Sequence, residues 1–353
     1  MRLFSTEQVS KYHPDKYADQ VSDAILDACL KEDKDSRVAC ETLIKGNTIV
    51  LAGEITTKAK VGFADVAGSV SKKLGYKMPY VASYITMQSP QIAMGVKGGD
   101  ELCAGDQGMM YGYACRETES MLPFGFDLAN KIIAAIEADV AAEPNQLVGD
   151  AKCQVTVDLD APKNMSSVKK VLVSACHTRD FKLDYVKARV KDILFQLGVY
   201  EGRAEIIVNP AGEWTIGGAE ADCGLTGRKI VCDQYGGYCP VGGGAFSGKD
   251  PSKVDRSGAY MARQIACDIL TEFGDVDNVE VQIAYAIGQR EPMSVNVRTE
   301  GRDAFDEMAT AWVMKEYDLT PSGIIKRLGL LDPSRVNYEK LAEGCHFRNG
   351  MWR

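Results

Sequence analysis

One pattern constrains the fold more than any other: two neighbouring strands accompanied by an amphipathic helix occur three times along the 353 residues. The strand pairs are expected at 38–45 and 48–57, at 154–160 and 169–177, and at 279–287 and 293–298, with helices at 62–74, 184–197 and 303–317. A strand pair that is apolar on one face has to bury that face against a helix. The pattern therefore predicts an α+β protein of three related subdomains, each a β-sheet covered by helices.

Two further helices are expected, because apolar residues recur at helical spacing after Pro14 and again between Ser257 and Phe273. In the first of these, Asp19, Asp23 and Asp27 lie on the face opposite the apolar one. A chain of this length usually forms one large body or a few subdomains. We predict subdomains at 1–140, 141–255 and 256–353, with the chain crossing between them.

Composition narrows the class of protein. The net charge of −8 argues against a general nucleic-acid binder. No apolar run is long enough to span a membrane, and the N-terminal residues do not form the apolar stretch of a signal peptide. The 11 cysteines contain no CxxC pair, which indicates reduced thiols and a cytoplasmic protein, and with 3 histidines no structural zinc site is expected.

Positive charge is nevertheless concentrated in one stretch of this acidic chain. Only Asp233, Asp250 and Asp255 oppose the cations between residues 226 and 263, which are Arg228, Lys229, Lys249, Lys253, Arg256 and Arg263. Such a local excess predicts a binding site for an anion.

The most informative motif is the glycine-rich run 242–257, in which Lys249, Lys253 and Arg256 follow three consecutive glycines. A glycine loop before a helix can offer backbone N–H groups to phosphate oxygens. Residues 243–249 match GxxxxGK, but Asp250 stands where a P-loop NTPase needs Ser or Thr to hold magnesium. We interpret the run as a phosphate loop of another kind, the alternative being a tight turn with solvated lysines.

Shorter motifs point to the same chemistry. Residues 222–229 place Arg228 and Lys229 before a strand expected at Ile230–Asp233, where the two cations could clamp a phosphate. In 13–16, Asp15 could hold magnesium while His13 and Lys16 meet an oxyanion at a helix N-terminus. Taken alone, the pair Arg228 and Lys229 is also typical of surface charge, and residues 13–16 are also typical of a helix cap with solvated charges. The weaker candidates are Asp106 in a glycine turn, Asp150 and Lys152 before a strand, and Trp214 as a stacking partner for a base.

Together these motifs resemble the methionine adenosyltransferase (S-adenosylmethionine synthetase) family. The resemblance is carried by the runs 13–16, 39–42, 53–57, 104–108, 222–229 and 242–257, which follow the family order and span nearly the whole chain. It implies three pseudo-threefold-related subdomains, ATP and L-methionine as substrates, Mg²⁺ and K⁺ as cofactors, and a homodimer or homotetramer with active sites at the subunit interface. The implied reaction is attack of the methionine sulfur on C5′ of ATP, followed by hydrolysis of the released tripolyphosphate.

The resemblance also implies roles for individual residues. The catalytic residues would be His13, Lys152, Arg228, Lys229 and Lys249. ATP would be bound by these residues together with Asp106, Asp150, Trp214, Asp222 and Ala245. Methionine would be bound by Glu54, Gln88, Asp222 and Lys253, with 88–92 (Gln88, Ser89, Pro90, Gln91 and Ile92) as a mobile loop. Magnesium would be held by Glu7, Asp15 and Asp255, and potassium by Glu41.

The sequence departs from the family at Lys11 and Tyr12, where Glu-Gly is usual. The ring of Tyr12 is expected either near the nucleoside or on the outside of the helix start, and Lys11 is expected to tighten polyphosphate binding if it reaches the site. Two alternative functions are a P-loop NTPase, which would release ADP, and a non-catalytic partner subunit. Lys249, Asp15 and Lys152 argue against the second, because a purely regulatory subunit has no need of them.

Overall fold

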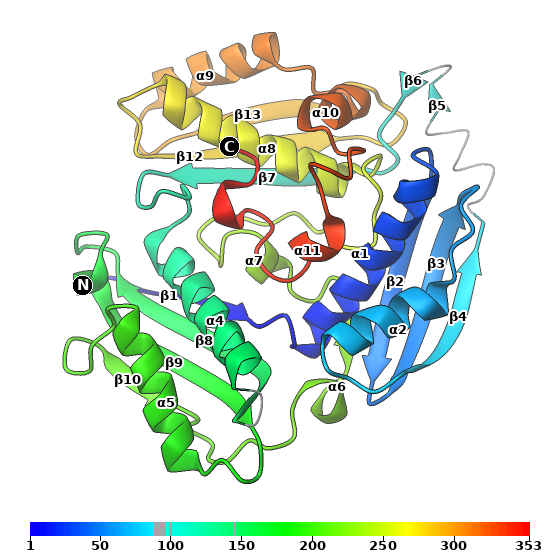
Figure 1. Ribbon diagram of the computed structural model, residues 1–353. Helices are drawn as coiled ribbons and strands as arrows, with labels where there is room; N and C mark the ends of the chain where they lie inside the picture. The colour runs from blue at the N-terminus through cyan, green and yellow to red at the C-terminus, as the bar shows by residue number, and fades with distance from the viewer. Residues whose placement is uncertain (88–96, 99–100, 144–145) are drawn as a thin grey trace.

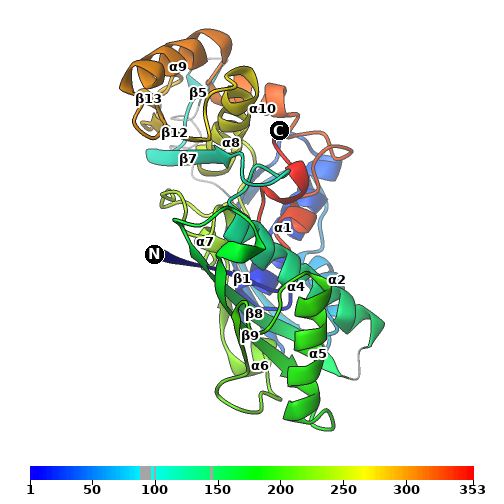
Figure 2. The same ribbon diagram turned by 90° about the vertical axis from the view of Figure 1, so that its left-hand side faces the viewer.

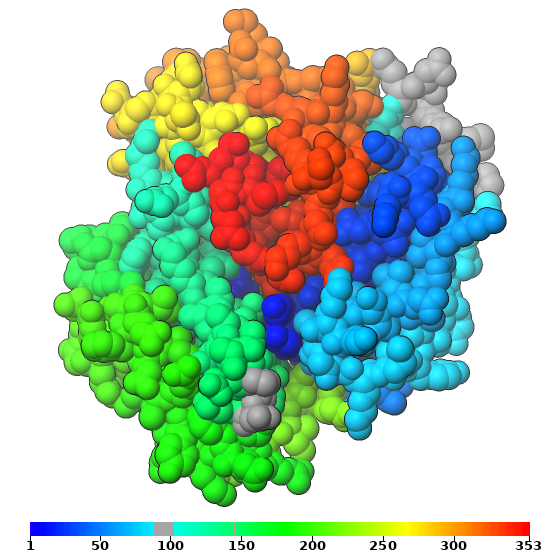
Figure 3. All heavy atoms as spheres, viewed as in Figure 1, coloured from blue at the N-terminus to red at the C-terminus, as the bar shows by residue number. Residues whose placement is uncertain are grey.

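The computed structural model describes residues 1–87, 97–98, 101–143 and 146–353 of the chain. Three β-sheets, each with helices on one face, surround a C-terminal segment that fills the middle of the face shown in Figures 1 and 3. Turning the molecule shows the strands β1, β8 and β9 on one side and the helices that cover them on the other (Figure 2). The α+β fold of three sheet-and-helix units predicted from the sequence is confirmed.

The first sheet has the strand order β11-β2-β3-β4 and is covered by α1 and α2. Its elements are β2 (Arg37–Lys45), β3 (Thr48–Thr56), β4 (Tyr80–Thr86), β11 (Gly224–Leu225), α1 (Pro14–Glu32) and α2 (Phe63–Lys73). Helix α1 begins where expected, because Pro14 occupies its first turn and the His13 side chain accepts a hydrogen bond from the Asp15 N–H. Val21 and Ile25 pack into the core below.

The second sheet has the order β1-β8-β9-β10 and lies behind α4 and α5 in the view of Figure 1. Its elements are β1 (Leu3–Val9), β8 (Leu147–Asp158), β9 (Val168–His177), β10 (Glu205–Val208), α4 (Phe124–Ala142) and α5 (Leu183–Gln196). The apolar residues between this sheet and its helices form a core of their own, separate from that of the other two units.

The third sheet has the order β13-β12-β7 and packs against α8. Its elements are β7 (Gly108–Cys115), β12 (Asn278–Tyr285), β13 (Ser294–Arg298), α8 (Val254–Glu272), α9 (Asp303–Glu316) and α10 (Pro321–Leu328). Helix α8 lies so close to β7 that a side chain on Gly112 would overlap the backbone of Ala262. Strand β12 ends at Tyr285, and the predicted last strand residue, Ile287, is exposed beyond it.

Each sheet also contains a strand from a distant part of the chain. Strand β1 pairs with β8, β11 pairs with β2, and β7 pairs with β12, all antiparallel. Other short elements join the units: β5 (Lys97–Gly98), β6 (Glu101–Leu102), η1 (Met165–Ser167), α6 (Gly218–Ala221), α7 (Ile230–Asp233), α11 (Tyr338–Leu341) and η2 (Arg348–Gly350). The ranges 1–140, 141–255 and 256–353 stay a prediction about how the chain divides.

The predicted strand at Ile230–Asp233 is wrong: these residues form the short helix α7. The pair Ile-Val favours a strand locally, but Asp233 is fully buried and bonds the Lys16 ammonium group of α1. A helical turn brings that carboxylate to the lysine, so a tertiary contact overrides the local preference.

Candidate active site

The N-terminus of α1 and the loop after β11 meet in one polar corner. Asp15 is the centre of this corner, because its Oδ1 accepts from the Leu225 N–H at 3.0 Å and its Oδ2 from Lys229 Nζ at 2.5 Å. Arg228 Nε lies 3.8 Å from the same carboxylate. His13 is buried beside it and accepts from the Asp15 N–H through Nδ1 at 3.1 Å. The corner thus joins two predicted motifs that are about 200 residues apart in sequence.

The electrostatics of this corner keep His13 uncharged. Burial, followed by the positive charges of Lys229 and Lys152, lowers the pKa of His13 from 6.5 to about 3. Since Nδ1 accepts a hydrogen bond, the proton of the neutral ring is on Nε2. Burial acts to raise the pKa of Asp15, but the hydrogen bonds from Lys229 and Leu225 outweigh it and the pKa is lowered. At neutral pH the corner therefore holds a carboxylate, an imidazole N–H donor and several cations.

Asp150, Lys152 and Asp222 belong to the same electrostatic neighbourhood. Lys152 and Asp222 each act on the charge of both His13 and Asp150. Asp150 is buried, and its Oδ2 accepts from the Gly218 N–H at 2.6 Å while its Oδ1 has no partner among the described residues. Burial raises the pKa of Asp150. The Oδ1 atom is itself buried.

The glycine-rich loop lies against this corner. A side chain on Gly227 would collide with Ala245, so the loops 222–229 and 242–253 are in direct contact. Lys249 Nζ is 2.6 Å from Asp255 Oδ2, and both side chains are partly exposed. Gly244 and Gly108 also pack on Asp255, which brings the turn of Asp106 to the same place. The predicted phosphate loops therefore do converge.

Two predicted acids lie on the face of the first sheet that points away from its helices. Ala39 pairs with Glu54 and Glu41 with Ala52, so both glutamates project from the same, exposed face. Ala39 also forms a bridge with Lys249. The backbone thus places Glu54 next to the strand residue that contacts the glycine loop.

Other predicted site residues lie further from this corner. Glu7 is exposed on β1, and Trp214 is partly buried with its indole N–H bonded to the Ile216 carbonyl at 2.8 Å. Lys253 is an ion-pair partner of Asp250. The predicted mobile loop 88–92 lies outside the described residues.

The P-loop alternative has no support in this geometry. Asp250 is fully buried and accepts from the N–H groups of Val38 at 2.7 Å and Ser252 at 2.9 Å. It is a structural acceptor in the position where a P-loop would need a residue that faces nucleotide-bound magnesium.

The structure corrects the list of cations that could meet an anion. Lys16 is fully buried between Asp19, at 3.0 Å, and Asp233. Arg256 is fully buried against Asp23, at 2.7 Å, and Arg263 donates to main-chain carbonyls, among them Ser120 O at 2.6 Å. These three cations hold the fold together, and Arg228, Lys229, Lys249 and Lys253 remain accessible.

The sequence places Asp19 and Asp23 on one face of α1, but their role was not predicted. Asp19 Oδ1 accepts from the Gly227 N–H at 2.9 Å, and Asp23 Oδ1 accepts from the Gly248 N–H at 2.8 Å. Both carboxylates are fully buried, so one helix face positions both phosphate loops. The sequence carried a signal for this role. Asp19 and Asp23 are four residues apart, which places them on one helix face, and the cations of both loops follow glycines.

The residues that depart from the family pattern lie next to this site. The Tyr12 ring packs on Gly149 and lines a cavity of about 440 Å³ with Asp150 and Ile216. The Lys11 N–H donates to Glu137 of α4 at 2.7 Å, and its Nζ lies 5.4 Å from the centre of the Tyr12 ring. Lys11 is thus directed to α4 and to Tyr12, and among the described residues no contact joins its side chain to Asp15 or Lys229.

Within the described residues, no three or more His, Cys, Asp or Glu side chains are grouped closely enough to hold a metal ion. Asp15 and Asp255, two of the predicted magnesium ligands, each contact a lysine instead. Mg²⁺ is usually bound by one or two carboxylates with substrate phosphates supplying further ligands. The donors present therefore fit a metal that is held jointly with a phosphate-bearing substrate.

No helix in the described part of the chain is long and apolar enough to cross a membrane.

Comparison with known proteins gives a consistent result. Models of the N-terminal, central and C-terminal domains of S-adenosylmethionine synthetase match residues 1–97, 101–214 and 216–352. The S-adenosylmethionine synthase of Brachyspira hyodysenteriae is 43% identical over 371 aligned positions, covering 98% of this chain and 92% of that protein. That of Salinibacter ruber is 42% identical, with coverage of 98% and 93%. A solved structure described as an unusual S-adenosylmethionine synthetase from Campylobacter jejuni is 32% identical, with a TM-score of 0.88 and coverage of 97% and 94%.

Proposed function

The chain belongs to the S-adenosylmethionine synthetase family and is a methionine adenosyltransferase, and from this premise we propose how its residues make S-adenosylmethionine. The sulfur of L-methionine attacks C5′ of ATP, the C5′–O bond breaks, and tripolyphosphate leaves and is hydrolysed to phosphate and pyrophosphate. The observation that supports this most directly is the corner of His13, Asp15 and Lys229, which joins a neutral N–H donor to accessible cations.

The reaction needs charge stabilisation more than a base. A thioether sulfur already carries its lone pair, so no proton has to be removed before attack. Negative charge grows on the leaving oxygen, and preorganised donors aimed at that oxygen stabilise the transition state. His13 donates from Nε2 to the leaving oxygen, while Lys152, Arg228, Lys229 and Lys249 surround the triphosphate.

The remaining roles are proposed from the resemblance to the family. Asp106, Asp150, Trp214 and Ala245 contact the nucleoside part of ATP, and Asp150 lines the cavity beside Tyr12. Glu54 and Asp222 hold the ammonium group of methionine, and Lys253 and Gln88 hold its carboxylate. The segment 88–92 closes over both substrates.

We assign Asp15, Asp255 and Glu7 to magnesium and Glu41 to potassium. When bound, Mg²⁺ would neutralise charge on the phosphates. Lys229 and Lys249 contact Asp15 and Asp255 in its absence and turn to the phosphate oxygens when the substrate arrives.

The assembly we propose is a homodimer or a pair of homodimers with shared sites. Exposed apolar side chains lie on the strands, among them Leu43, Tyr80 and Tyr84 of the first sheet and Met109 of the third. A second copy that packs on the open sheet faces would cover them and would add residues to the site. A cytoplasmic location fits the 11 cysteines, none of which forms a disulfide.

The decisive experiment incubates the protein with ATP, methionine, Mg²⁺ and K⁺ and identifies the products by mass spectrometry. We expect S-adenosylmethionine, phosphate and pyrophosphate, with inversion of configuration when the ATP carries a stereospecific deuterium at C5′. ADP as the only nucleotide product would overturn the proposal, and retention of configuration would overturn direct attack by sulfur.

Shared sites can be tested by mixing two inactive variants, Lys249→Ala and Lys152→Ala. If the two residues of one site come from different subunits, a mixed dimer contains one intact site and activity returns. Mixing Lys249→Ala with wild type serves as the reference for subunit exchange. No recovery, in chains shown to exchange, would place both residues in one subunit.

A further inference from the structure

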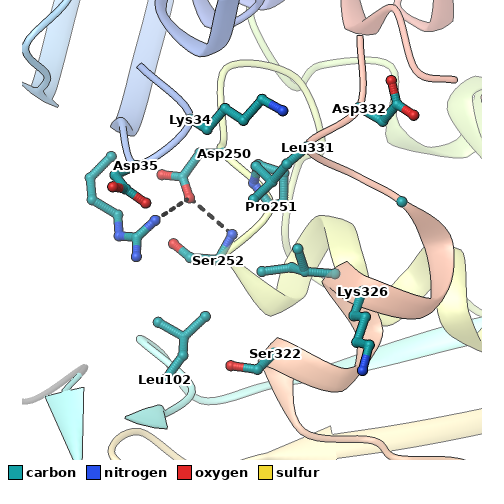
Figure 4. A pocket seen from close by; sticks show the side chains of 13 residues that line it. Lys34, Asp35, Leu102, Asp250, Pro251, Ser252, Ser322, Lys326, Leu331 and Asp332 are labelled. Atoms are coloured by element: carbon teal, nitrogen blue, oxygen red, sulfur yellow. Dashed lines mark hydrogen bonds and ion pairs between the residues drawn. The ribbon is translucent and has the colours of Figure 1, made fainter. Parts of the chain in front are cut away.

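A cavity of about 700 Å³ lies outside the corner described above, between residues 34–37, the turn 250–252 and helix α10 (Figure 4). Its volume is in the range of pockets that bind small organic molecules. The glycine-loop lysines and the α1 N-terminus do not line it. It is therefore separate from the proposed substrate site.

Three cationic side chains line the cavity, and two of them have no close anionic partner within the described ranges. The side chains of Lys34 and Lys326 make no hydrogen bond or ion pair there, although the charge of Lys34 acts on Asp332. Arg37 is about one-third exposed and reaches only to 3.9 Å from Asp250 Oδ1. Three cations therefore face this space from two separate parts of the chain.

Two of the three acids in the lining are already engaged. Asp250 bonds Lys253 and two N–H groups. Asp332 accepts from the N–H of Ser334 at 2.9 Å and from its hydroxyl at 2.7 Å. Asp35 is exposed to solvent. Lys34 and Lys326 are exposed as well. The cations and the acids of the lining are equal in number, but the acids are the better bonded of the two. Ser252 and Ser322 add hydroxyl groups.

The same cavity has an apolar part, formed by Leu102, Pro251, Ile325 and Leu331. Cations and hydroxyls suit a phosphate dianion, because charge-assisted hydrogen bonds are the strong ones. The apolar part suits a carbon skeleton attached to that phosphate. The chemistry of the lining is that of a site for a small organic phosphate.

Asp250 connects this cavity to the proposed methionine site. It is fully buried, it contacts Arg37 on the cavity side, and its other oxygen is held by Lys253. An anion that draws Arg37 into the cavity leaves Lys253 as the principal counter-charge of a buried carboxylate. Lys253 is then less available to the carboxylate of methionine.

We propose that this cavity binds a small organic phosphate monoester, and that its occupancy weakens methionine binding through Arg37, Asp250 and Lys253. The binding site stands on its own geometry, whereas the effect on methionine rests on the proposed function of Lys253. Coupling between two sites is reciprocal, so methionine should weaken phosphate-ester binding by the same factor.

Binding is tested with glycerol 2-phosphate by calorimetry in the absence of both substrates. We expect saturable binding that weakens roughly tenfold or more in the double variant Lys34→Ala/Lys326→Ala, since charge-assisted contacts are lost. The matched control Lys170→Ala/Lys182→Ala removes two exposed lysines of the second unit and should stay within about twofold of wild type.

Several outcomes overturn the binding site. These are no saturable binding, equal affinity in the cavity double variant and wild type, or loss of binding in Lys249→Ala, which would place the ligand in the substrate site. If glycerol 2-phosphate bound no more tightly than inorganic phosphate, the proposal that the cavity also recognises the organic part of the ligand would be wrong.

The coupling is tested by steady-state kinetics at a fixed, saturating ATP concentration. Glycerol 2-phosphate should raise the KM for methionine about fivefold with kcat unchanged, and this effect should vanish in Lys34→Ala/Lys326→Ala. Binding by calorimetry with no change in KM would overturn the coupling through Lys253. A protein that makes no S-adenosylmethionine would refute the proposed function, and calorimetry would still decide the binding site.

Discussion

Two groups of cations in this molecule look alike in sequence and differ in the structure. Lys16, Arg256 and Arg263 are fully buried and bonded within the protein, whereas Lys229 and Lys249 are partly exposed, each beside one carboxylate. Lys16 follows Asp15 directly, and Arg256 follows Asp255. In each motif, the cation thus belongs to the core and the aspartate before it belongs to the site.

The two groups differ in whether the cation can leave its carboxylate partner at low cost. Removing one partner of a buried ion pair leaves an uncompensated charge in the core, which is strongly destabilising. A partly exposed pair such as Lys249–Asp255 contributes little to stability, so its lysine can move to a substrate phosphate at low cost. The buried group should therefore control folding, and the accessible group should control catalysis.

The largest effect should come from breaking a buried pair. Arg256→Met leaves Asp23 buried without its cation and removes the guanidinium from the Tyr338 ring, 4.6 Å away. We expect a loss of about 3–5 kcal/mol in the free energy of unfolding, measured with urea. A loss below about 1 kcal/mol would show that Arg256 is not a structural cation and would break the comparison.

The converse holds for the accessible group. Lys249→Ala should lower kcat by roughly 10²–10³, as expected for one donor aimed at growing charge, while the unfolding free energy changes by less than about 1 kcal/mol. The matched control is Lys60→Ala, an exposed lysine outside the site. Turnover within a few-fold of wild type would remove Lys249 from the catalytic group.

His13 sharpens the comparison, because it is buried like the first group and belongs to the site like the second. Its folded-state pKa of about 3 lies below the ordinary 6.5, so the unfolded chain binds the extra proton first as pH falls. Stability is therefore present above pH 6.5 and is lost as pH falls toward 3. When the pH falls from 7 to 5, the unfolding free energy of His13→Asn should therefore fall by about 2 kcal/mol less than that of wild type.

The measurement for His13 compares the slope of unfolding free energy against pH in the two proteins, which cancels any constant cost of the substitution. His346, also buried with a lowered pKa, is present in both and contributes equally. Equal slopes would mean that the pKa of His13 is the same in the folded and the unfolded protein, and that the site does not keep the ring neutral as pH falls.

The sequence predicted those parts of the fold that are set by local pattern. Helix α1, strand β9 and the strand pairs β2–β3 and β12–β13 lie within a few residues of their expected ranges, whereas β8 begins at Leu147 and not at 154. Strands β1 and β7 were missed, because each is stabilised by a partner more than 140 residues away. Gly112 in β7 even weakens the local strand signal, since its role is to admit α8.

The candidate site was predicted by motif and not by geometry. Motifs placed Asp15, Lys229 and Lys249 in a common function, and the structure brings their loops together. No pattern could separate Lys16 from Lys229, because the burial of Lys16 depends on Asp233, which is far away in sequence. The roles of Asp19 and Asp23 were missed for the same reason: their partners are backbone N–H groups of distant loops.

The smallest effect should come from Lys11, a partly exposed cation beside the site motif and outside both groups. Sequence alone allowed Lys11 to reach the polyphosphate, but its N–H bonds Glu137 and its ammonium lies over the Tyr12 ring. Lys11→Ala removes that cation–π contact, which costs at most about 1 kcal/mol of unfolding free energy at such a site. The inhibition constant for tripolyphosphate at fixed magnesium should change less than about twofold, because proximity along the chain without a contact contributes little. If inhibition by tripolyphosphate weakened tenfold or more, Lys11 would belong with the catalytic cations. Accessibility in the isolated chain would then no longer distinguish the buried cations from the catalytic ones.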